Sequence, residues 1–414
     1  MAAESEPSRP PKAPFGIRLL APLRHRPFAL LWSGQTISRI GNGVYSTVLA
    51  WTVYAISHST SATGFVIMAS AIPQVIFLLA GGLVGDRVSR RAIILVSDSL
   101  SGIAAGSVAV IALTGHLTVP LLAVLAVIFG TVSAFFLPAY QAIIPEVISA
   151  EQLQTANGLE GLSMSAVSIA GPSIGAAVYA WGRVGAAFGF DALTFLVSAS
   201  TMLLIRVPGR IVTVKQSIWE DVREGWGYVR GTSWLWVSIV LAAFANAAGT
   251  GPIGVLMPAI IDRLHLGIAY LGLTFTIMGL ALLAGNVIVA QLPPLRHRGY
   301  IMYIMWAMID LGPVVFGVAP NFLVLAAGAV LLGAGGAADA IWQGLVQEAV
   351  PRQYLSRVYS LDLLGSLALR PIGLAASGVI AAYIGPNATM VGGGLLAFAF
   401  VVAGLAVPAI RRLD

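Results

Sequence analysis

Long apolar runs recur along this 414-residue chain, and short segments that carry most of its charges separate them. A helix needs about 20 mostly apolar residues to cross the hydrocarbon core of a bilayer. Twelve runs reach that length in our reading of the sequence. Only 10% of the residues are charged, whereas soluble domains have about 25%. The sequence therefore predicts an all-α membrane protein with twelve transmembrane helices, whose surface mostly faces lipid.

The runs also predict how the chain is divided. We expect an N-terminal six-helix bundle over 28–205 and a C-terminal six-helix bundle over 233–409, with a linker at 206–232. Residues 1–27 form a polar, Pro-rich cytoplasmic tail that we expect to be disordered, and 410–414 form a short cytoplasmic C-terminus. The expected spans are 28–55, 61–85, 92–114, 118–144, 153–180, 184–205, 233–262, 269–291, 299–318, 322–348, 355–383 and 387–409.

The linker contains an amphipathic stretch. Trp219, Val222, Trp226 and Val229 recur at helical spacing, with Arg and Glu residues between them. Such a helix has one apolar face and one charged face, which is typical of helices that lie in a membrane interface. We expect this helix to lie along the cytoplasmic surface of the membrane.

The positive charges predict the orientation. All but four of the 23 Lys and Arg residues fall in the tails, the linker and the loops of one side. The exceptions are Arg39 and Arg370 within spans, and Arg183 and Arg263 on the other side. Loops rich in Lys and Arg stay in the cytoplasm. Both termini are therefore predicted to be cytoplasmic, in a multi-pass protein of the inner (cytoplasmic) cell membrane.

The two halves carry an internal repeat. Residues 141–159 align without gaps on 343–361, at an offset of 202. The first Gln, the Glu at 146 and 348, and two Leu residues are identical in this alignment. The match falls at the fourth and tenth spans, as a duplicated six-helix unit predicts. Parallel repeats of this kind are found in transporters that alternate between two open states.

The loop between the second and third spans carries a specific motif. Residues 82–91 read GLVGDRVSRR and resemble the loop pattern G-x-x-x-D-R-x-G-R-R of the major facilitator superfamily, with Ser89 in place of the second Gly. The resemblance implies the major facilitator fold and a cytoplasmic latch, in which the carboxylate faces a helix N-terminus of the eleventh span and the arginines hold the interface between halves. The alternative is a basic loop that only sets topology. The latch residues are Gly82, Gly85, Asp86, Arg87, Arg90 and Arg91.

Further segments resemble the enterobactin-exporter and macrolide-efflux branch of that superfamily. These are GFDALTF at 189–195, EQLQTAN at 151–157, and residues around Arg357 and Arg230. In the fifth span, the helix-kink motif Gly171, Pro172 and Gly175 resembles the GPxxG motif of antiporters. It bends a helix and permits close packing. A packing kink and a role in coupling remain alternative interpretations of this motif.

Polar residues within spans indicate a substrate path. In the superfamily the first, fourth, seventh and tenth spans line the central cavity, and polar side chains of this chain recur on one face of several of them. Arg370, near the middle of the eleventh span, is added to this set. The predicted substrate-cavity residues are Gln35, Arg39, Asn42, Tyr140, Gln141, Asn246, Asp339, Gln343 and Arg370.

The spans contain more acids than bases. Two arginines cannot neutralise the carboxyls of Asp98, Asp191, Asp310, Asp339 and Asp362. A charge without a partner is costly in a membrane, so some of these groups should be protonated, or exchange protons as access to water changes. We expect proton coupling at Asp339, Asp98 and Asp362. Asp310 is on a span that is usually peripheral, where a structural hydrogen bond is expected; Asp191 is assigned either to helix stability or to function.

These observations predict a secondary active transporter. It would export an amphipathic small molecule of drug, macrolide or siderophore type by alternating access, in exchange for protons. The alternatives are proton-coupled uptake and, from another class, a membrane sensor without transport. The sequence has no phosphate-binding G-K-[ST] loop, zinc-binding H-E-x-x-H motif or Cys, so we expect no ATP hydrolysis, enzyme activity, metal site or cofactor beyond the proton gradient. The expected partners are the substrate and the bilayer, without nucleic acid, for a chain that acts as a monomer.

Overall fold

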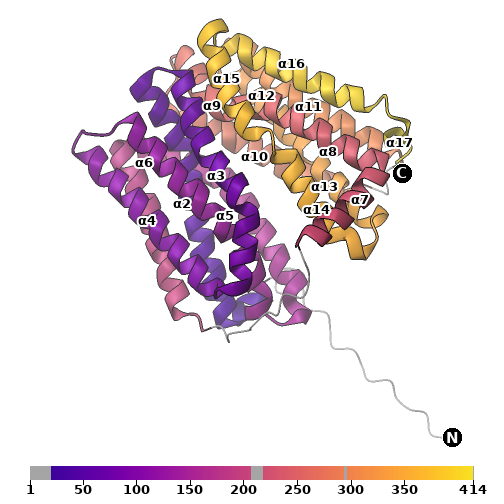
Figure 1. The fold of residues 1–414 in the computed structure, drawn as a ribbon. Helices are drawn as coiled ribbons and strands as arrows, with labels where there is room; N and C mark the ends of the chain where they lie inside the picture. Colours follow the sequence, from indigo (N-terminus) through magenta and orange to yellow (C-terminus); the bar gives the residue numbers. More distant parts are fainter. Residues whose placement is uncertain (1–19, 207–217, 293–295, 414) are drawn as a thin grey trace, which may run out of the picture.

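The computed structural model describes residues 20–206, 218–292 and 296–413. Within these ranges, the side chains at 78–87, 150, 218–222, 352, 356 and 367 are outside the description. Every regular element in the described residues is a helix. The first and second halves of the chain form two helical bundles (Figure 1).

The N-terminal half contains long, mostly uninterrupted helices. They are η1 (Ala21–Arg24), α2 (Arg26–Ser57), α3 (Thr60–Arg87), α4 (Arg90–Leu113), α5 (Val119–Val147), η2 (Ala150–Gln152) and α6 (Leu153–Leu204). α6 has 52 residues and contains a break at Gly182 and Arg183, where Arg183 has a φ of 57°. The break separates two crossings, because about 20 residues already span a bilayer.

The C-terminal half repeats this arrangement in shorter pieces. Its elements are α7 (Ile218–Gly231), α8 (Ser233–Ala245), η3 (Asn246–Thr250), α9 (Gly251–Arg263), α10 (Ile268–Gln291), α11 (Arg298–Val318), α12 (Phe322–Gly336), α13 (Ala338–Ala349), α14 (Arg352–Leu367), α15 (Arg370–Ile384), α16 (Pro386–Gly404) and α17 (Pro408–Arg411). The pieces α8–η3–α9, α12–α13 and α14–α15 are each one crossing with an interruption.

The number of crossings agrees with the sequence. Ten helices of the described residues are long and apolar enough to cross a membrane, and α6 is one of them although it contains two crossings. α2 has 32 residues and adds the last crossing, because Arg39 and several amide and hydroxyl side chains lower its hydropathy without shortening it. The predicted twelve-helix membrane fold with two six-helix repeats is confirmed.

The two halves also contain equivalent ion pairs, as the internal repeat predicts. Arg90 at the start of α4 pairs with Glu146 near the end of α5, and Arg298 at the start of α11 pairs with Glu348 near the end of α13. The two glutamates are the residues that the offset of 202 makes equivalent. Each half therefore ties its third and fourth crossings together in the same way.

The two halves contact each other toward one end of the molecule, which we call the closed end. There the Oγ1 of Thr60 on α3 donates a hydrogen bond to the carbonyl of Gly378 on α15, 2.9 Å away. The second contact between the halves joins α6 and α10, where the hydroxyls of Ser173 and Thr276 are 2.6 Å apart. A Cβ at Gly64 would meet the carbonyl oxygen of Leu374 at 2.8 Å, so this glycine permits the close approach of α3 and α15.

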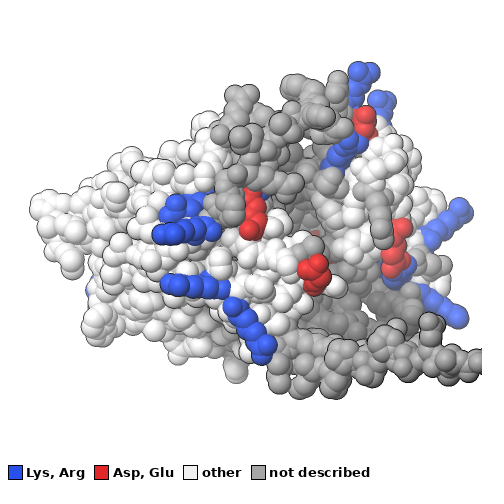
Figure 2. Space-filling model, turned by 90° about the horizontal axis from the view of Figure 1, so that it is seen from below, with Lys and Arg blue, Asp and Glu red and all other residues white. Residues whose placement is uncertain are grey.

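At the opposite end, which we call the open end, the described residues form no hydrogen bond or ion pair between the halves. Twelve crossings place the start of α2 and the C-terminus at this end. Seen from below, basic side chains lie on both halves with a hollow between them (Figure 2). Among the described residues, the two halves are therefore joined at the closed end and apart on the side of the chain termini.

The linker helix α7 packs on the C-terminal half. Arg357 on α14 pairs with Glu224 on α7, and the ring of Tyr228 stacks on that of Tyr354. Val229 is buried in the core of this half, whereas Trp226 is 54% exposed. The predicted apolar face therefore packs partly on protein, and its first half lies outside the described side chains.

Candidate functional site

A cavity of about 1040 Å³ extends into the C-terminal half. The seventh to twelfth crossings supply most of its lining, and the N-terminal half contributes Gln141 and Ser168. Its size suits a drug-sized molecule, because ligand pockets measure about 300–1,000 Å³. The cavity is thus asymmetric: among the described residues, the C-terminal half supplies most of the lining and the N-terminal half supplies two residues.

Three of the crossings that line the cavity are interrupted beside it. α8 passes into the π-helix η3 (Asn246–Thr250), α12 and α13 are separated by Ala337, and α14 and α15 are separated between 367 and 370. Pro371 explains the last break, because proline cannot continue a helix that precedes it. Interrupted helices and π-bulges are frequent at functional sites in transporters, since they free backbone groups where a cavity can satisfy them.

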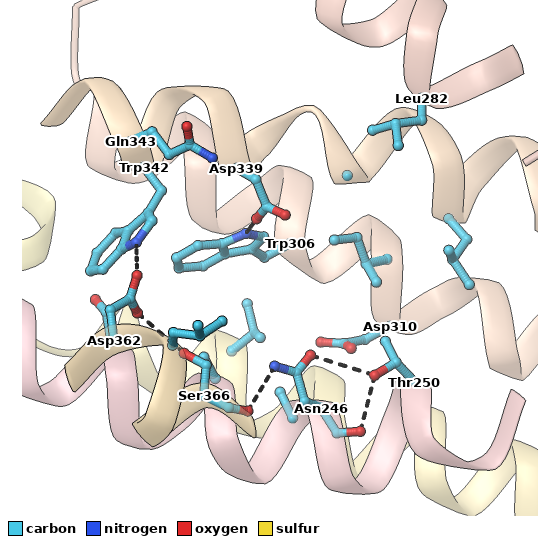
Figure 3. Close-up of a pocket in the computed structure, with 18 of the residues that line it drawn as sticks. Asn246, Thr250, Leu282, Trp306, Asp310, Asp339, Trp342, Gln343, Asp362 and Ser366 are labelled. Carbon is cyan, nitrogen blue, oxygen red and sulfur yellow. Dashed lines mark hydrogen bonds between the residues drawn. The ribbon is translucent and has the colours of Figure 1, made fainter. Parts of the chain in front are cut away.

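Two carboxylates face aromatic rings across the cavity (Figure 3). The indole Nε1 of Trp306 on α11 donates to Oδ1 of Asp339 on α13, 3.1 Å away. The Nε1 of Trp342 donates to Oδ2 of Asp362 on α14 at 2.8 Å. Ser366 donates from one turn further along α14 to Asp362 Oδ1 at 3.2 Å. These neutral donors orient both carboxylates without supplying a compensating charge.

Asp310 on α11 is the third carboxylate of the cavity. It is 3% exposed, and its Oδ2 has no hydrogen-bond partner among the described residues. Gly249 in η3 makes room for it, since a Cβ there would lie 3.0 Å from Asp310 Oδ1. The expected structural hydrogen bond of Asp310 is thus absent at Oδ2 among the described residues, and Asp310 lines the cavity instead.

The described lining residues include three Asp and no Lys, Arg or His. The other polar groups are amides, hydroxyls and indoles, such as Asn246, whose Nδ2 donates to the Ser366 carbonyl at 3.2 Å. An excess of carboxyls in a partly apolar cavity requires protons or a bound cation for compensation. The arrangement can therefore exchange protons and attract positive ligands.

Some predicted site residues lie in this cavity and others do not. Gln141, Asn246, Asp339 and Gln343 line it, and so does Asp362, which was expected to take part in proton coupling. Sequence reasoning missed Trp306, Trp342, Thr250 and Ser366. A usable signal for the two tryptophans was an indole about one turn from an acid in the same span, as in Trp306 with Asp310 and Trp342 with Asp339.

The remaining N-terminal residues belong to polar networks within their own half. Gln35 is buried, and its Nε2 donates to Asp98 Oδ2 at 3.0 Å, where Ser198 also donates at 2.7 Å. Asn42 lines a small cavity of about 30 Å³ beside Asp98. The expectation that Gln35 and Asn42 line the large cavity is corrected: the Gln35 amide binds the buried Asp98 carboxyl, and Asn42 lines the small cavity next to it.

The prediction that Arg39 and Tyr140 line the large cavity is also corrected, because both bind groups within the N-terminal half. Arg39 Nη1 on α2 donates to Oε2 of Glu160 on α6 at 2.6 Å, and its guanidinium lies over the Tyr140 ring, 4.6 Å from the centroid. Tyr140 donates to Oε1 of the same glutamate at 2.6 Å. The pair is mostly buried and satisfied inside the N-terminal half, so neither residue lines the large cavity.

Arg370 begins α15, next to Pro371, and does not line the cavity. Its side chain is exposed and has no hydrogen bond or ion pair with the described residues.

The latch residues Gly82, Gly85, Asp86 and Arg87 have side chains outside the described part of the structure. Arg90 donates to Glu146 and to the Ala142 carbonyl, and Arg91 donates to the last carbonyls of α6, at Met202 and Leu203. Both arginines therefore bind groups of their own half, not the interface between halves as expected. Because the halves are apart at the open end, helix C-termini nearby provide the partners.

The helix-kink motif lies where three helices meet. Gly171 on α6 packs against Gly43 on α2, and Pro172 faces Gly272 on α10, whose Cβ would meet the proline carbonyl oxygen at 2.8 Å. Gly175 packs against Val44. The motif thus contributes both to the N-terminal bundle and to the contact between halves.

The comparison with protein families agrees with this geometry. A family model described as "transmembrane secretion effector" matches residues 17–338, which is most of the chain. The chain belongs to this family of the major facilitator superfamily. It is therefore a multi-pass membrane protein of a transporter family.

Two named relatives match over nearly the whole chain. Macrolide efflux protein A of Streptococcus pyogenes is 23% identical over 398 residues, which cover 94% of this chain and 97% of that protein. Enterobactin exporter EntS of Citrobacter koseri is 22% identical over 382 residues, with 92% and 91% covered. The resemblance to this branch is thereby confirmed.

A solved structure shares the fold. A bacterial homologue of the human lysosomal transporter Spinster, in an inward-facing and occupied conformation, superposes with a TM-score of 0.72 at 13% identity, over 93% of this chain and 97% of that one. At this identity the likeness supports the fold alone.

Proposed function

We propose that this protein is a secondary transporter that exports an amphipathic small molecule in exchange for protons. The observation that carries the proposal is the cavity with Asp310, Asp339 and Asp362 and no cationic side chain among its described lining residues. In a chain closed at one end and open at the other, such carboxyls can bind protons in one state and release them in the next.

Two further points support export as the direction of transport. The efflux activities named for the relatives from Streptococcus pyogenes and Citrobacter koseri make export the first choice, with a macrolide or a siderophore as candidate substrates. The basic residues near the termini support the proposal that both termini are on the cytoplasmic side of the inner membrane. The open end then faces the cytoplasm, from which an exporter takes its substrate.

We propose transport without enzyme activity, with no cofactor beyond the proton gradient. The substrate and the bilayer are the proposed partners, without nucleic acid, and the chain acts as a monomer. One buried apolar cluster includes residues of both halves, and each half has a further cluster of its own, so a single chain already joins the two halves.

The test is flux in proteoliposomes with an imposed pH gradient. Protons move from the acidic to the alkaline compartment, so an antiporter accumulates its substrate in the acidic compartment, whichever way the protein is inserted. Protein-free liposomes control for passive trapping of weak bases. Accumulation in the alkaline compartment would favour uptake by proton symport. Absence of any gradient-driven flux from folded protein would favour a sensor.

A further inference from the structure

The internal repeat pairs the residues around the cavity with residues of the N-terminal half. Continued by one residue at each end, the offset of 202 makes Tyr140 equivalent to Trp342 and Glu160 equivalent to Asp362. In both pairs an aromatic side chain donates a hydrogen bond to the acid. The distance is 2.6 Å from Tyr140 to Glu160 and 2.8 Å from Trp342 to Asp362. The two halves therefore hold an acid in the same setting.

The charge balance differs between these equivalent settings. In the N-terminal half, the Arg39 guanidinium pairs with Glu160 and lies over the aromatic ring. In the C-terminal half, Asp362 receives hydrogen bonds from Trp342 and Ser366, and no described cation pairs with it. Asp362 lines the large cavity, whereas Glu160 is not among the lining residues.

Asp362 has no described counterpart of Arg39, and the seventh crossing is the one that would carry it. The seventh and eleventh crossings run in the same direction, and Asn246 on η3 contacts Ser366 on α14 through a hydrogen bond. One turn earlier on each helix lie Ala242 and Asp362, and both line the cavity. The side chain level with Asp362 is thus a small alanine, on the crossing that is equivalent to the one that carries Arg39.

A second observation points to a ligand. Asp310 is 97% buried, since its exposed fraction is 3%; it is one of the residues that line the cavity, and its buried Oδ2 has no partner among the described residues. Trp306 and Trp342 add two indoles beside the acids, with ring centroids 5.7 Å apart. Carboxylates combined with indoles are the groups that recognise organic cations in water-poor sites.

We propose that the cavity binds the guanidinium or ammonium group of an amphipathic cation at Asp362, in the place that Arg39 occupies at Glu160. The apolar part of the ligand lies against Leu282, Leu332 and the indoles, which also line the cavity. The inference rests on the proposed function for its transport step, but the binding step stands on its own.

The test compares two probes of the same shape in purified full-length protein in nanodiscs. A medium-chain alkylguanidinium is a permanent cation at neutral pH, and the alkylurea of the same chain length is neutral. Isothermal titration calorimetry should show the guanidinium binding about tenfold tighter or more, with empty nanodiscs subtracted. Asp362→Asn should remove this preference, and Asp262→Asn, an exposed acid at the closed end, should leave it intact.

A second pair of variants tests the position. Ala242→Arg should fill the place with a tethered guanidinium and abolish binding of the probe, whereas Ala242→Gln, of comparable length without charge, should retain most of it. Equal binding of guanidinium and urea to the wild type, or an unchanged preference in Asp362→Asn, overturns the proposal. So does a preference that Ala242→Arg leaves unaltered.

The outcomes separate this inference from the proposed function. Proton-driven flux of a neutral substrate, with no preference for the guanidinium, would overturn the cation site and leave the transporter in place. Tight binding of the guanidinium without any flux would support the site and contradict the transport function.

Discussion

Arg39 on the first crossing and Glu160 on the fifth form a mostly buried ion pair, with 2.6 Å between Nη1 and Oε2. Tyr140 donates to the other glutamate oxygen and places its ring under the guanidinium. The three side chains thus satisfy one another without a ligand. This arrangement predicts a structural role in the N-terminal half, distinct from that of the acids around the cavity.

Glu160→Gln should therefore destabilise the protein. Removing one partner leaves the other charge buried and unpaired, which costs about 3–5 kcal/mol. Thermal unfolding in detergent, followed by intrinsic fluorescence, should show a lower Tm. The double variant Arg39→Met with Glu160→Gln should recover part of the loss, because no isolated charge remains, and Glu151→Gln at an exposed position is the control. A double variant less stable than the sum of both single variants would contradict this interpretation.

Asp339→Asn should uncouple transport from protons. The amide oxygen can still accept from the Trp306 indole, so the fold and the expression level should be retained, but the side chain can no longer release a proton. Accumulation driven by a pH gradient in proteoliposomes should be lost, while exchange of labelled for unlabelled substrate continues. Unchanged gradient-driven accumulation would exclude Asp339 as the proton carrier.

The same measurement on Asp98→Asn tests whether the N-terminal half takes part in coupling. Asp98 is 2% exposed and receives hydrogen bonds from Gln35 and Ser198, so an amide keeps at least one of them. We expect weaker coupling with a stable fold. Normal coupling together with a lower Tm would assign Asp98 to structure alone, and Ser200→Ala on the exposed face of α6 is the control.

Asp191→Ala should stabilise the protein. The side chain is fully buried, and neither carboxyl oxygen has a hydrogen-bond partner among the described residues. A buried polar group without a partner costs about 1–3 kcal/mol, of which the cavity left by the smaller side chain cancels a part. A higher Tm with unchanged flux would leave Asp191 without a role in transport. A higher Tm with lost flux would identify a functional acid, and a lower Tm would contradict the prediction.

Gly130→Ala should loosen the second and fourth crossings. A Cβ at this position would overlap the Ser70 carbonyl on α3, and forcing extra atoms into packed helices costs about 1–3 kcal/mol. Gly161→Ala is the matched control, because a Cβ there meets nothing within 4 Å and alanine favours helix. Differential scanning fluorimetry should show a lower Tm for the first variant and an equal or higher one for the second. Equal Tm values for both would contradict the close contact.

The fold could be predicted because its signal is local. A run of apolar residues that is long enough to cross a bilayer specifies a span, whichever helices it packs against. A helix breaker such as Pro371 interrupts the helix for a few residues, but the run remains one crossing. The site could be predicted in part. Asp339 and Gln343 share a helical face that spacing reveals, whereas Asp310 lies on a crossing that family expectation treats as peripheral.

The sequence by itself determined the twelve crossings, the repeat and the excess of acids in the membrane, since these depend on composition and on spacing along the chain. Only the tertiary structure decided which acid meets a base. Glu160 finds Arg39 across 121 positions, while its counterpart Asp362 faces a cavity. The physical reason is that charge compensation depends on distances between helices, and separations along the chain do not encode them.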